Sequence, residues 1–204
     1  MSQTPTDTAP DLIALLGSRI CHDLISPIGA ISNGVELLTL DGVGKGSELS
    51  LVCDSVTAAN ARIRFFRIAF GIARTGQAIG RPEILGILHD SYRSGRITLD
   101  WSSPADLQRR EVKTVFLLLL CAEQALPLGG RIQVTRDDDR WSLTLISARL
   151  RHDPALWAML QDDPALPPDL GAAEVQFALA GQALRAMQRP ARIAVTEEAL
   201  TLSF

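Results

Sequence analysis

Residues 19–30 read Arg-Ile-Cys-His-Asp-Leu-Ile-Ser-Pro-Ile-Gly-Ala, and the helical pattern around this stretch organises the rest of the chain. Apolar side chains recur there at steps of three and four, which predicts a helix with one continuous buried stripe. The stripe consists of Ile13, Leu16, Ile20, Leu24, Ile28, Ile31, Val35 and Leu38. His22 is off this stripe, so we expect its imidazole on a solvent-facing ridge of the helix.

Small and polar residues surround His22 on the same side of the helix. At about 100° per residue, this ridge is shared by Arg19, Ser26, Gly29, Asn33 and Glu36. Asp23 is adjacent, and Pro27 lies inside the helix, where it cannot donate to the carbonyl of Asp23. We therefore expect the helix to bend beside the histidine and leave that carbonyl free. The combination favours a chemically active imidazole over an incidental surface histidine.

Composition limits the possible function classes. The chain has 204 residues, of which 47% are apolar, which is enough for a sizeable core. The net charge of −3 shows no basic excess of the kind that nucleic-acid binding needs. The most apolar run, residues 115–122, is far shorter than the roughly 20 residues of a membrane span. Three cysteines in apolar helical patterns are expected to be reduced core residues, which points to the cytoplasm.

The first half of the chain is predicted to form a helical hairpin. The first helix is expected to end near Leu40, a glycine-rich turn covers residues 41–46, and a second helix runs from about Ser47 to Thr75. The second helix has a heptad seam at Leu49, Val52, Val56, Ala59, Ile63, Phe66, Phe70 and Ala73. A second apolar strip consists of Phe65, Ile68, Ala69 and Ile72. Two strips require either packing on the second half of the chain or, as we expect, an intermolecular four-helix bundle in a homodimer.

Folding the hairpin about its turn places His22 level with residues 64–67. Arg62, Arg64 and Arg67 are therefore expected near the histidine. Guanidinium groups there would form charge-assisted hydrogen bonds with a phosphoryl group or attract an acidic partner. The alternative is a solvated face that these arginines form with Asp54 and Glu48, and both interpretations remain open from the sequence.

The second half is predicted to be a two-layer α/β sandwich, which makes the whole chain α+β. Helices are expected at 82–93, 106–126 and 172–188, and strands at 96–101, 131–135, 141–146, 192–196 and 200–203. Helices on one face of a largely antiparallel sheet form such a sandwich. The domain assignment is a hairpin at 1–76, a linker at 77–81 and the α/β domain at 82–204.

Three stretches carry a resemblance to a known family. They are His22–Leu38, the run Arg-Phe-Phe-Arg-Ile-Ala-Phe-Gly at 64–71, and Ala122–Val134 with Leu-Pro-Leu-Gly-Gly at 126–130. Over nearly its whole length the chain resembles ChpT-type histidine phosphotransferases, bacterial relay proteins whose two domains imitate a histidine kinase dimer. The resemblance implies a degenerate kinase ATPase-like second domain. It also implies, as partners, the receiver domain of a CckA-like hybrid histidine kinase, together with CtrA-like and CpdR-like response regulators.

The sequence argues against a nucleotide site in the second domain. In a kinase-like helix, two magnesium-binding asparagines would fall at Leu117 and Cys121, and neither side chain can ligate a hard cation. Residues 131–170 contain no glycine, so a phosphate-cradling loop is missing, and the stretch 162–169 is acidic and rich in proline. We therefore expect no bound cofactor, with Mg²⁺ supplied by the partner receiver domains.

The resulting hypothesis is a phosphorelay. A neutral His22 nitrogen, expected to be Nε2, attacks an aspartyl phosphate on one receiver domain and passes the group to another. Asp23, or the carbonyl freed by Pro27, polarises the other ring nitrogen. Partner contacts are expected at Arg19, Ser26, Gly29, Asn33, Arg62, Arg64 and Arg67. The alternatives are an ATP-dependent sensor histidine kinase core and a non-catalytic docking scaffold.

Overall fold

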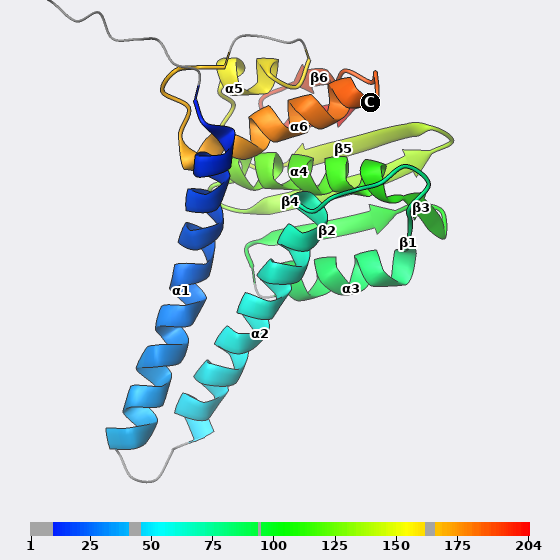
Figure 1. Ribbon diagram of the computed structural model, residues 1–204. Helices are drawn as coiled ribbons and strands as arrows, with labels where there is room; N and C mark the ends of the chain where they lie inside the picture. The colour runs from blue at the N-terminus through cyan, green and yellow to red at the C-terminus, as the bar shows by residue number, and fades with distance from the viewer. Residues whose placement is uncertain (1–9, 41–45, 94, 162–165) are drawn as a thin grey trace, which may run out of the picture.

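Two long antiparallel helices, α1 (Leu12–Leu40) and α2 (Gly46–Ala69), lead into a layer of helices packed on a sheet (Figure 1). The computed structural model describes residues 10–40, 46–93, 95–161 and 166–204. Most of the turn expected at 41–46 and part of the acidic stretch 162–169 lie outside these ranges. The other elements are β1 (Ala78–Gly80), α3 (Arg81–Tyr92), β2 (Ile97–Ser102), β3 (Asp106–Gln108), α4 (Arg109–Ala125), β4 (Gly130–Asp137), β5 (Arg140–Ile146), α5 (Pro154–Ala158), the 3-10 turn η1 (Ala172–Glu174), α6 (Val175–Ala186), β6 (Arg192–Val195) and β7 (Ala199–Ser203).

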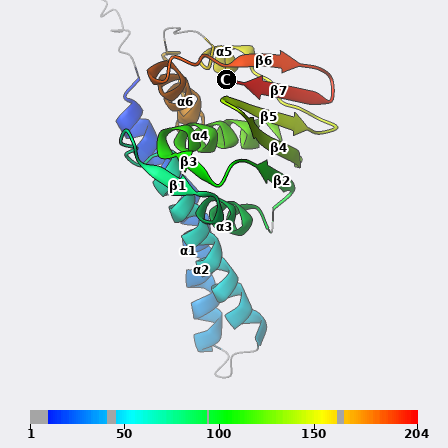
Figure 2. The same ribbon diagram turned by 90° about the vertical axis from the view of Figure 1, so that its right-hand side faces the viewer.

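The main sheet has five strands in the order β2-β4-β5-β7-β6. β2 pairs with β4 in parallel, and every other neighbouring pair is antiparallel. Helices α3, α4 and α6 cover one face of this sheet, and in the part of the chain that the structure describes the opposite face has no helix on it (Figure 2). The predicted α+β fold with a two-layer sandwich is confirmed.

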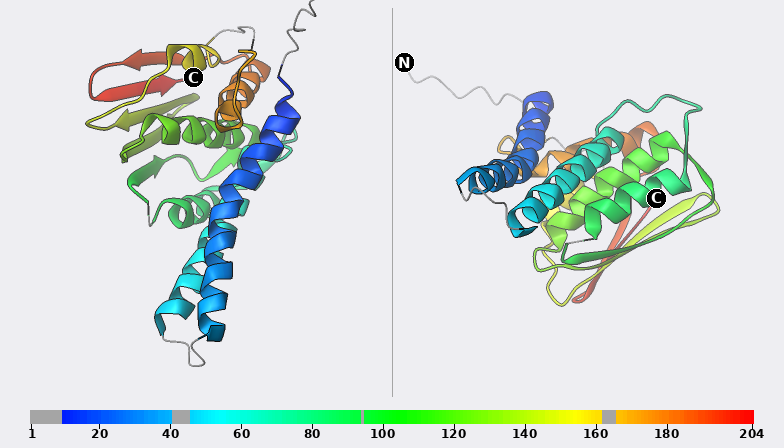
Figure 3. Two further views of the ribbon diagram at one scale, coloured as in Figure 1. Left: turned by 90° about the vertical axis from the view of Figure 1, so that its left-hand side faces the viewer. Right: turned by 90° about the horizontal axis from the view of Figure 1, so that it is seen from below.

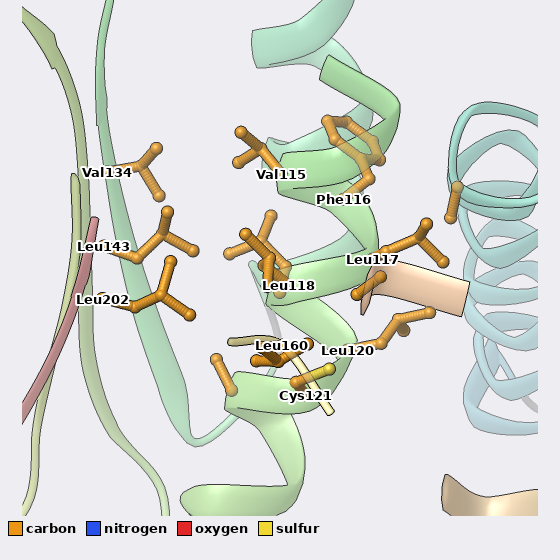
Figure 4. Packing of buried hydrophobic residues seen from close by; sticks show 14 of the residues in the cluster. Val115, Phe116, Leu117, Leu118, Leu120, Cys121, Val134, Leu143, Leu160 and Leu202 are labelled. Carbon is orange, nitrogen blue, oxygen red and sulfur yellow. The ribbon is translucent and has the colours of Figure 1, made fainter. Parts of the chain in front are cut away.

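Helix α4 lies at the centre of the molecule. Its apolar side chains point in two directions, Val115 and Leu118 toward the strands and Phe116 and Leu117 toward α2 (Figure 4). All four side chains are at most 1% exposed. Because both sides of α4 are covered, the hairpin and the α/β layer share one continuous hydrophobic core.

The second apolar strip of α2 joins the hairpin to this core. Phe65, Ile68 and Ala69 are 0–1% exposed, and the Phe65 ring centroid lies 4.6 Å from that of Phe116. Of the two alternatives for this strip, packing on the second half of the chain is therefore confirmed for Phe65, Ile68 and Ala69. Ile72 is 79% exposed because α2 ends at Ala69, before it reaches this position.

The end of α2 and the expected linker differ from the sequence-based prediction. Helix α2 ends at Ala69, short of the expected Thr75, and at Gly71 the chain turns so tightly that a Cβ there would lie 2.1 Å from the Arg67 carbonyl oxygen. The Lys113 ammonium donates to the Gly71 carbonyl at 2.9 Å, so α4 caps the end of the hairpin. The segment 77–81 contains β1, which pairs with β3 in a separate two-stranded sheet.

The hairpin projects beyond the sandwich (Figure 3). Many of its apolar side chains are exposed. Gly34 packs against Val52, and a Cβ at Gly34 would overlap that side chain. The prediction of one fully buried stripe on α1 is wrong within a single chain, because residues on one side of the stripe point away from α2. Ile13, Ile28 and Val35 are 83%, 54% and 47% exposed. Two of the cysteines expected in the core, Cys21 and Cys53, are exposed as well.

Over Leu12–Leu38, helix α1 has the length and apolar composition that a membrane span needs. Length and composition alone are weak evidence for a membrane span, and the ion-paired Arg19 and Asp23 lie within this segment. Helix α1 also packs on α2, η1 and α6.

Phe65 provides a direct test of how the hairpin is attached to the sandwich. We expect Phe65→Ala to lower the free energy of unfolding by about 3–5 kcal/mol, because it opens a cavity between α2 and α4. Ile72→Ala, in the same predicted strip but exposed, should change it by less than about 0.5 kcal/mol. Urea denaturation followed by circular dichroism measures both, and equal effects would contradict this packing.

Candidate functional site

His22 stands on the outer side of α1 with its side chain 87% exposed. Its Nδ1 lies 3.3 Å from Oδ1 of Asp23. An ionised carboxylate only accepts hydrogen bonds, so this contact requires the proton on Nδ1. The lone pair of Nε2 is then left on the exposed side of the ring, which gives His22 the form of a neutral nitrogen nucleophile.

Asp23 is held by two arginines. Its Oδ2 accepts hydrogen bonds from Nε of Arg19 at 3.2 Å and from Nε and Nη2 of Arg62 at 3.2 and 2.5 Å. Burial by itself would raise the pKa of Asp23, but the hydrogen bond and charge of Arg62, with the charge of Arg19, outweigh it and lower that pKa. The carboxylate therefore stays ionised and leaves Oδ1 for the imidazole.

Arg62 is shared between two carboxylates from different parts of the fold. Its Nη1 and Nη2 lie 3.3–3.4 Å from the Glu123 carboxylate of α4, and Tyr92 of α3 donates to Glu123 Oε1 at 2.7 Å. The guanidinium also lies over the Phe66 ring, 4.7 Å from its centroid. Burial would lower the pKa of Arg62, but Glu123 and Asp23 raise it further above its ordinary value.

Sequence reasoning did not single out Glu123 or Tyr92. Some signal was present, because Glu123 is a carboxylate near the end of a strongly apolar helix and Tyr92 is the chain's single tyrosine. Their connection to Asp23 could not be predicted from a local pattern, because the hydrogen bonds that make it join residues 31 to 61 positions apart in the sequence.

The arginines expected around His22 do not converge on it. Arg19 is only 15% exposed and also donates to the Ala173 carbonyl at 3.0 Å, so it ties α1 to η1. Arg62 is engaged by Asp23 and Glu123 and is 21% exposed, so its donors are occupied inside the protein rather than offered to a partner. Arg64 pairs with Asp90 of α3, and Arg67 is exposed farther along the hairpin.

The rest of the predicted ridge is open. Ser26 and Asn33 are exposed, and a Cβ built at Gly29 would meet no atom within 4 Å. Helix α1 runs through Pro27 as one continuous helix. Within the described ranges, no group of three or more His, Cys, Asp or Glu side chains is placed to hold a metal ion.

Comparisons with known proteins agree with this architecture. Residues 81–199 match the family model of the histidine phosphotransferase C-terminal domain. The chain therefore belongs to the histidine phosphotransferase family.

More particularly, the chain is of the ChpT type. It is 37% identical over 160 residues, 76% of each chain, to the protein phosphotransferase ChpT of Brucella abortus (strain 2308). The solved structure of a bacterial phosphotransferase superimposes with a TM-score of 0.78 at 31% identity, covering 100% of this chain and 98% of the other. The histidine kinase AdeS of Acinetobacter baumannii is a more distant match, at 14% identity and a TM-score of 0.44 over 89% of this chain and 95% of that one.

The shared arginine predicts a pH-dependent stability effect. We expect Arg62→Met to lower the free energy of unfolding by about 3 kcal/mol at pH 7, because two carboxylates lose their common counter-ion. Asp23 has a lowered pKa when folded, so its stabilising contribution is present above its unfolded pKa of about 3.9 and is lost as the pH falls below it. The difference between wild type and variant should therefore shrink from pH 7 to pH 3.

Urea denaturation at several pH values measures this difference. Arg131→Met removes the exposed ion pair with Asp100 and should leave stability nearly unchanged at every pH. A constant cost for Arg62→Met across the pH range would contradict the assignment of Arg62 as the counter-ion of an ionised Asp23.

Proposed function

We propose that this phosphotransferase relays a phosphoryl group between aspartates of receiver domains through His22 and does so without ATP. The observation that carries this proposal is the geometry of His22. The ring is exposed, while its Nδ1 is held by a carboxylate that stays ionised. An exposed nucleophile with a fixed tautomer suits a reaction whose other half is brought by a partner protein.

The transfer proceeds by exchange of one bond for another. The Nε2 lone pair attacks the phosphorus of a receiver's aspartyl phosphate, an N–P bond forms, and the P–O bond breaks with its electrons leaving on the receiver carboxylate. The ring then carries a proton on Nδ1 and positive charge, which the Asp23 carboxylate stabilises. The reverse sequence delivers the group to a second receiver, and the receivers supply the Mg²⁺ that both transfers need.

The packing of the second domain supports the absence of ATP. The positions where a kinase would hold magnesium, Leu117 and Cys121, are 1% and 0% exposed, and burial raises the pKa of the Cys121 thiol. Trp157 and Leu160, from the connection before α6, are also buried in the core. The Ala191 amide donates to the Leu160 carbonyl at 3.1 Å, which ties this segment to the residue that precedes β6.

The proposed partners follow from the family. They are the receiver domain of a CckA-like hybrid kinase upstream and CtrA-like and CpdR-like regulators downstream, all meeting the protein in the cytoplasm. The open ridge of Ser26, Gly29 and Asn33 lies beside His22 and would let a receiver's acidic pocket approach the ring. Arg64 and Arg67, farther along α2, are exposed enough to contact the receiver. Arg19 and Arg62 act instead from behind the histidine.

The hairpin is proposed to form a four-helix bundle with a second copy of the chain. Ile28 and Val35 on α1 and Leu49, Val56 and Ile63 on α2 are 40–56% exposed, and they repeat every seven residues. This is the spacing of a continuous interhelical seam. A face of this kind is stable when another hairpin covers it.

Phosphotransfer from a labelled receiver tests the proposed reaction. We expect the wild-type protein to become labelled within minutes and His22→Gln to incorporate at least about 100-fold less label, because the nucleophile is gone. His89→Gln and His152→Gln, which alter the other two histidines, should retain the label. Labelled ATP, supplied in place of the phosphorylated receiver, should label none of these proteins. Transfer to His22→Gln or labelling of wild type by ATP would overturn the proposal.

The bundle is tested by the mass of the protein in solution. We expect wild type to sediment as a dimer and Val56→Glu as a monomer, because the substitution buries a charge in the seam. Leu51→Glu makes the same change about 140° away around α2 and should stay dimeric. A monomeric wild type, or a dimeric Val56→Glu, would contradict the four-helix bundle.

A further inference from the structure

We propose that Glu123, a residue of the α/β domain, is a positioning residue for phosphotransfer at His22, acting through Arg62 and Asp23. This inference rests on the proposed function, since it concerns the rate of the same reaction. The second domain would then affect the rate of phosphotransfer at His22 on the hairpin, in addition to any contact that it makes with a receiver domain.

An unbroken line of polar contacts joins the two domains. Tyr92 donates to Glu123 at 2.7 Å, and the Glu123 carboxylate lies 3.3–3.4 Å from Nη1 and Nη2 of Arg62. Arg62 in turn donates to Oδ2 of Asp23 at 2.5 Å, and Oδ1 of Asp23 lies 3.3 Å from Nδ1 of His22. Side chains from α1, α2, α3 and α4 each contribute one or more members.

The charge balance of this line gives Glu123 a specific effect. Asp23 faces two guanidinium groups, Arg19 and Arg62, which together would over-neutralise one carboxylate. Glu123 draws part of the Arg62 charge to itself and brings the group of two arginines and two carboxylates to zero net charge. Asp23 therefore keeps enough negative character to hold the Nδ1 proton of the imidazole.

This negative character matters most during the transfer. As the N–P bond forms at Nε2 and the receiver's P–O bond breaks, positive charge develops on the ring next to Asp23. A carboxylate that is already fully compensated by arginine stabilises this charge less, because electrostatic preorganisation depends on the net field at the reacting group. Removing the charge of Glu123 should therefore slow the transfer even though Glu123 does not touch His22.

The pH profile should move in a defined direction. Within the described residues, the charged and titratable groups along this line of contacts are Arg19 and Asp23 on α1, Arg62 on α2, Tyr92 on α3, and Glu123 with the buried Cys121 thiol on α4. The Ala173 carbonyl of η1 accepts from Arg19. Loss of one negative charge from this set disfavours the imidazolium form of His22. The rate, which falls as the ring takes up a proton, should then fall at a lower pH than in wild type.

Single-turnover transfer from a labelled receiver, measured from pH 5 to 9, tests the inference with Glu123→Gln in the full-length protein. We expect the plateau rate to fall about tenfold and the midpoint of the pH profile to shift to lower pH. In the Asp23→Asn background, Glu123→Gln should cause little further loss, because the residue through which it acts is already altered.

A matched control lies on the same helix. Glu111 is buried and paired with Arg136 at 3.2 Å, about 18 Å along α4 from Glu123. Glu111→Gln should lower the stability of the protein but leave both the plateau rate and the pH midpoint unchanged. This comparison separates a general loss of packing from a specific effect on His22.

Each outcome decides a different claim. If wild type accepts no label, the proposed function fails. If wild type is labelled and folded Glu123→Gln matches it in rate and midpoint, or if the losses of Glu123→Gln and Asp23→Asn simply add, this inference alone is wrong. Should Glu123→Gln not fold, Tyr92→Phe carries the test. It removes a hydrogen bond to Glu123 without changing charge, so we expect a rate about threefold lower at an unchanged midpoint, and an unchanged rate would overturn the inference.

Discussion

The structure depends on one cation shared between two carboxylates. The side chain of Arg62, on α2, lies between the carboxylates of Asp23 on α1 and Glu123 on α4. A single guanidinium therefore connects both helices of the hairpin to the central helix of the sandwich. A buried charge is costly unless its partners are well placed, and here Asp23, Glu123 and the ring of Phe66 all lie within interaction distance. The position of His22 relative to the second domain follows from this arrangement.

The apolar contacts around Arg62 make this geometry rigid. Phe65 and Ala69 are fully buried against α4, and Lys113 and Arg109 at the start of α4 donate to the Gly71 and Arg67 carbonyls near the end of α2. These contacts hold the hairpin against the sandwich and fix the place of His22 relative to the second domain.

The exposure of His22 and the exposure of the hairpin seam have different meanings. The imidazole is exposed on the side where small residues such as Ser26 and Gly29 leave room, and its hydrogen-bond partner lies behind it. The seam residues, such as Val56, are aliphatic, uncharged and spaced by heptads. Under the proposed function the first pattern belongs to a nucleophile and the second to a contact between two copies of the chain. Periodicity distinguishes them, because apolar contact needs a continuous face whereas one nucleophile does not.

The sequence by itself determined most of the helices and strands of this protein and singled out His22 as its candidate nucleophile. The stripe around His22, the heptads of α2 and the alternation in β4 and β5 are local patterns, and the local physics of helices and strands is sufficient to produce them. The tertiary structure alone decided where α2 ends, that residues 78–80 form a strand rather than a linker, and that Arg62 is engaged by Glu123 and Asp23 instead of facing a partner. These features depend on contacts between residues far apart in the chain, such as Arg62 with Glu123 and β1 with β3, whose energies no local pattern records.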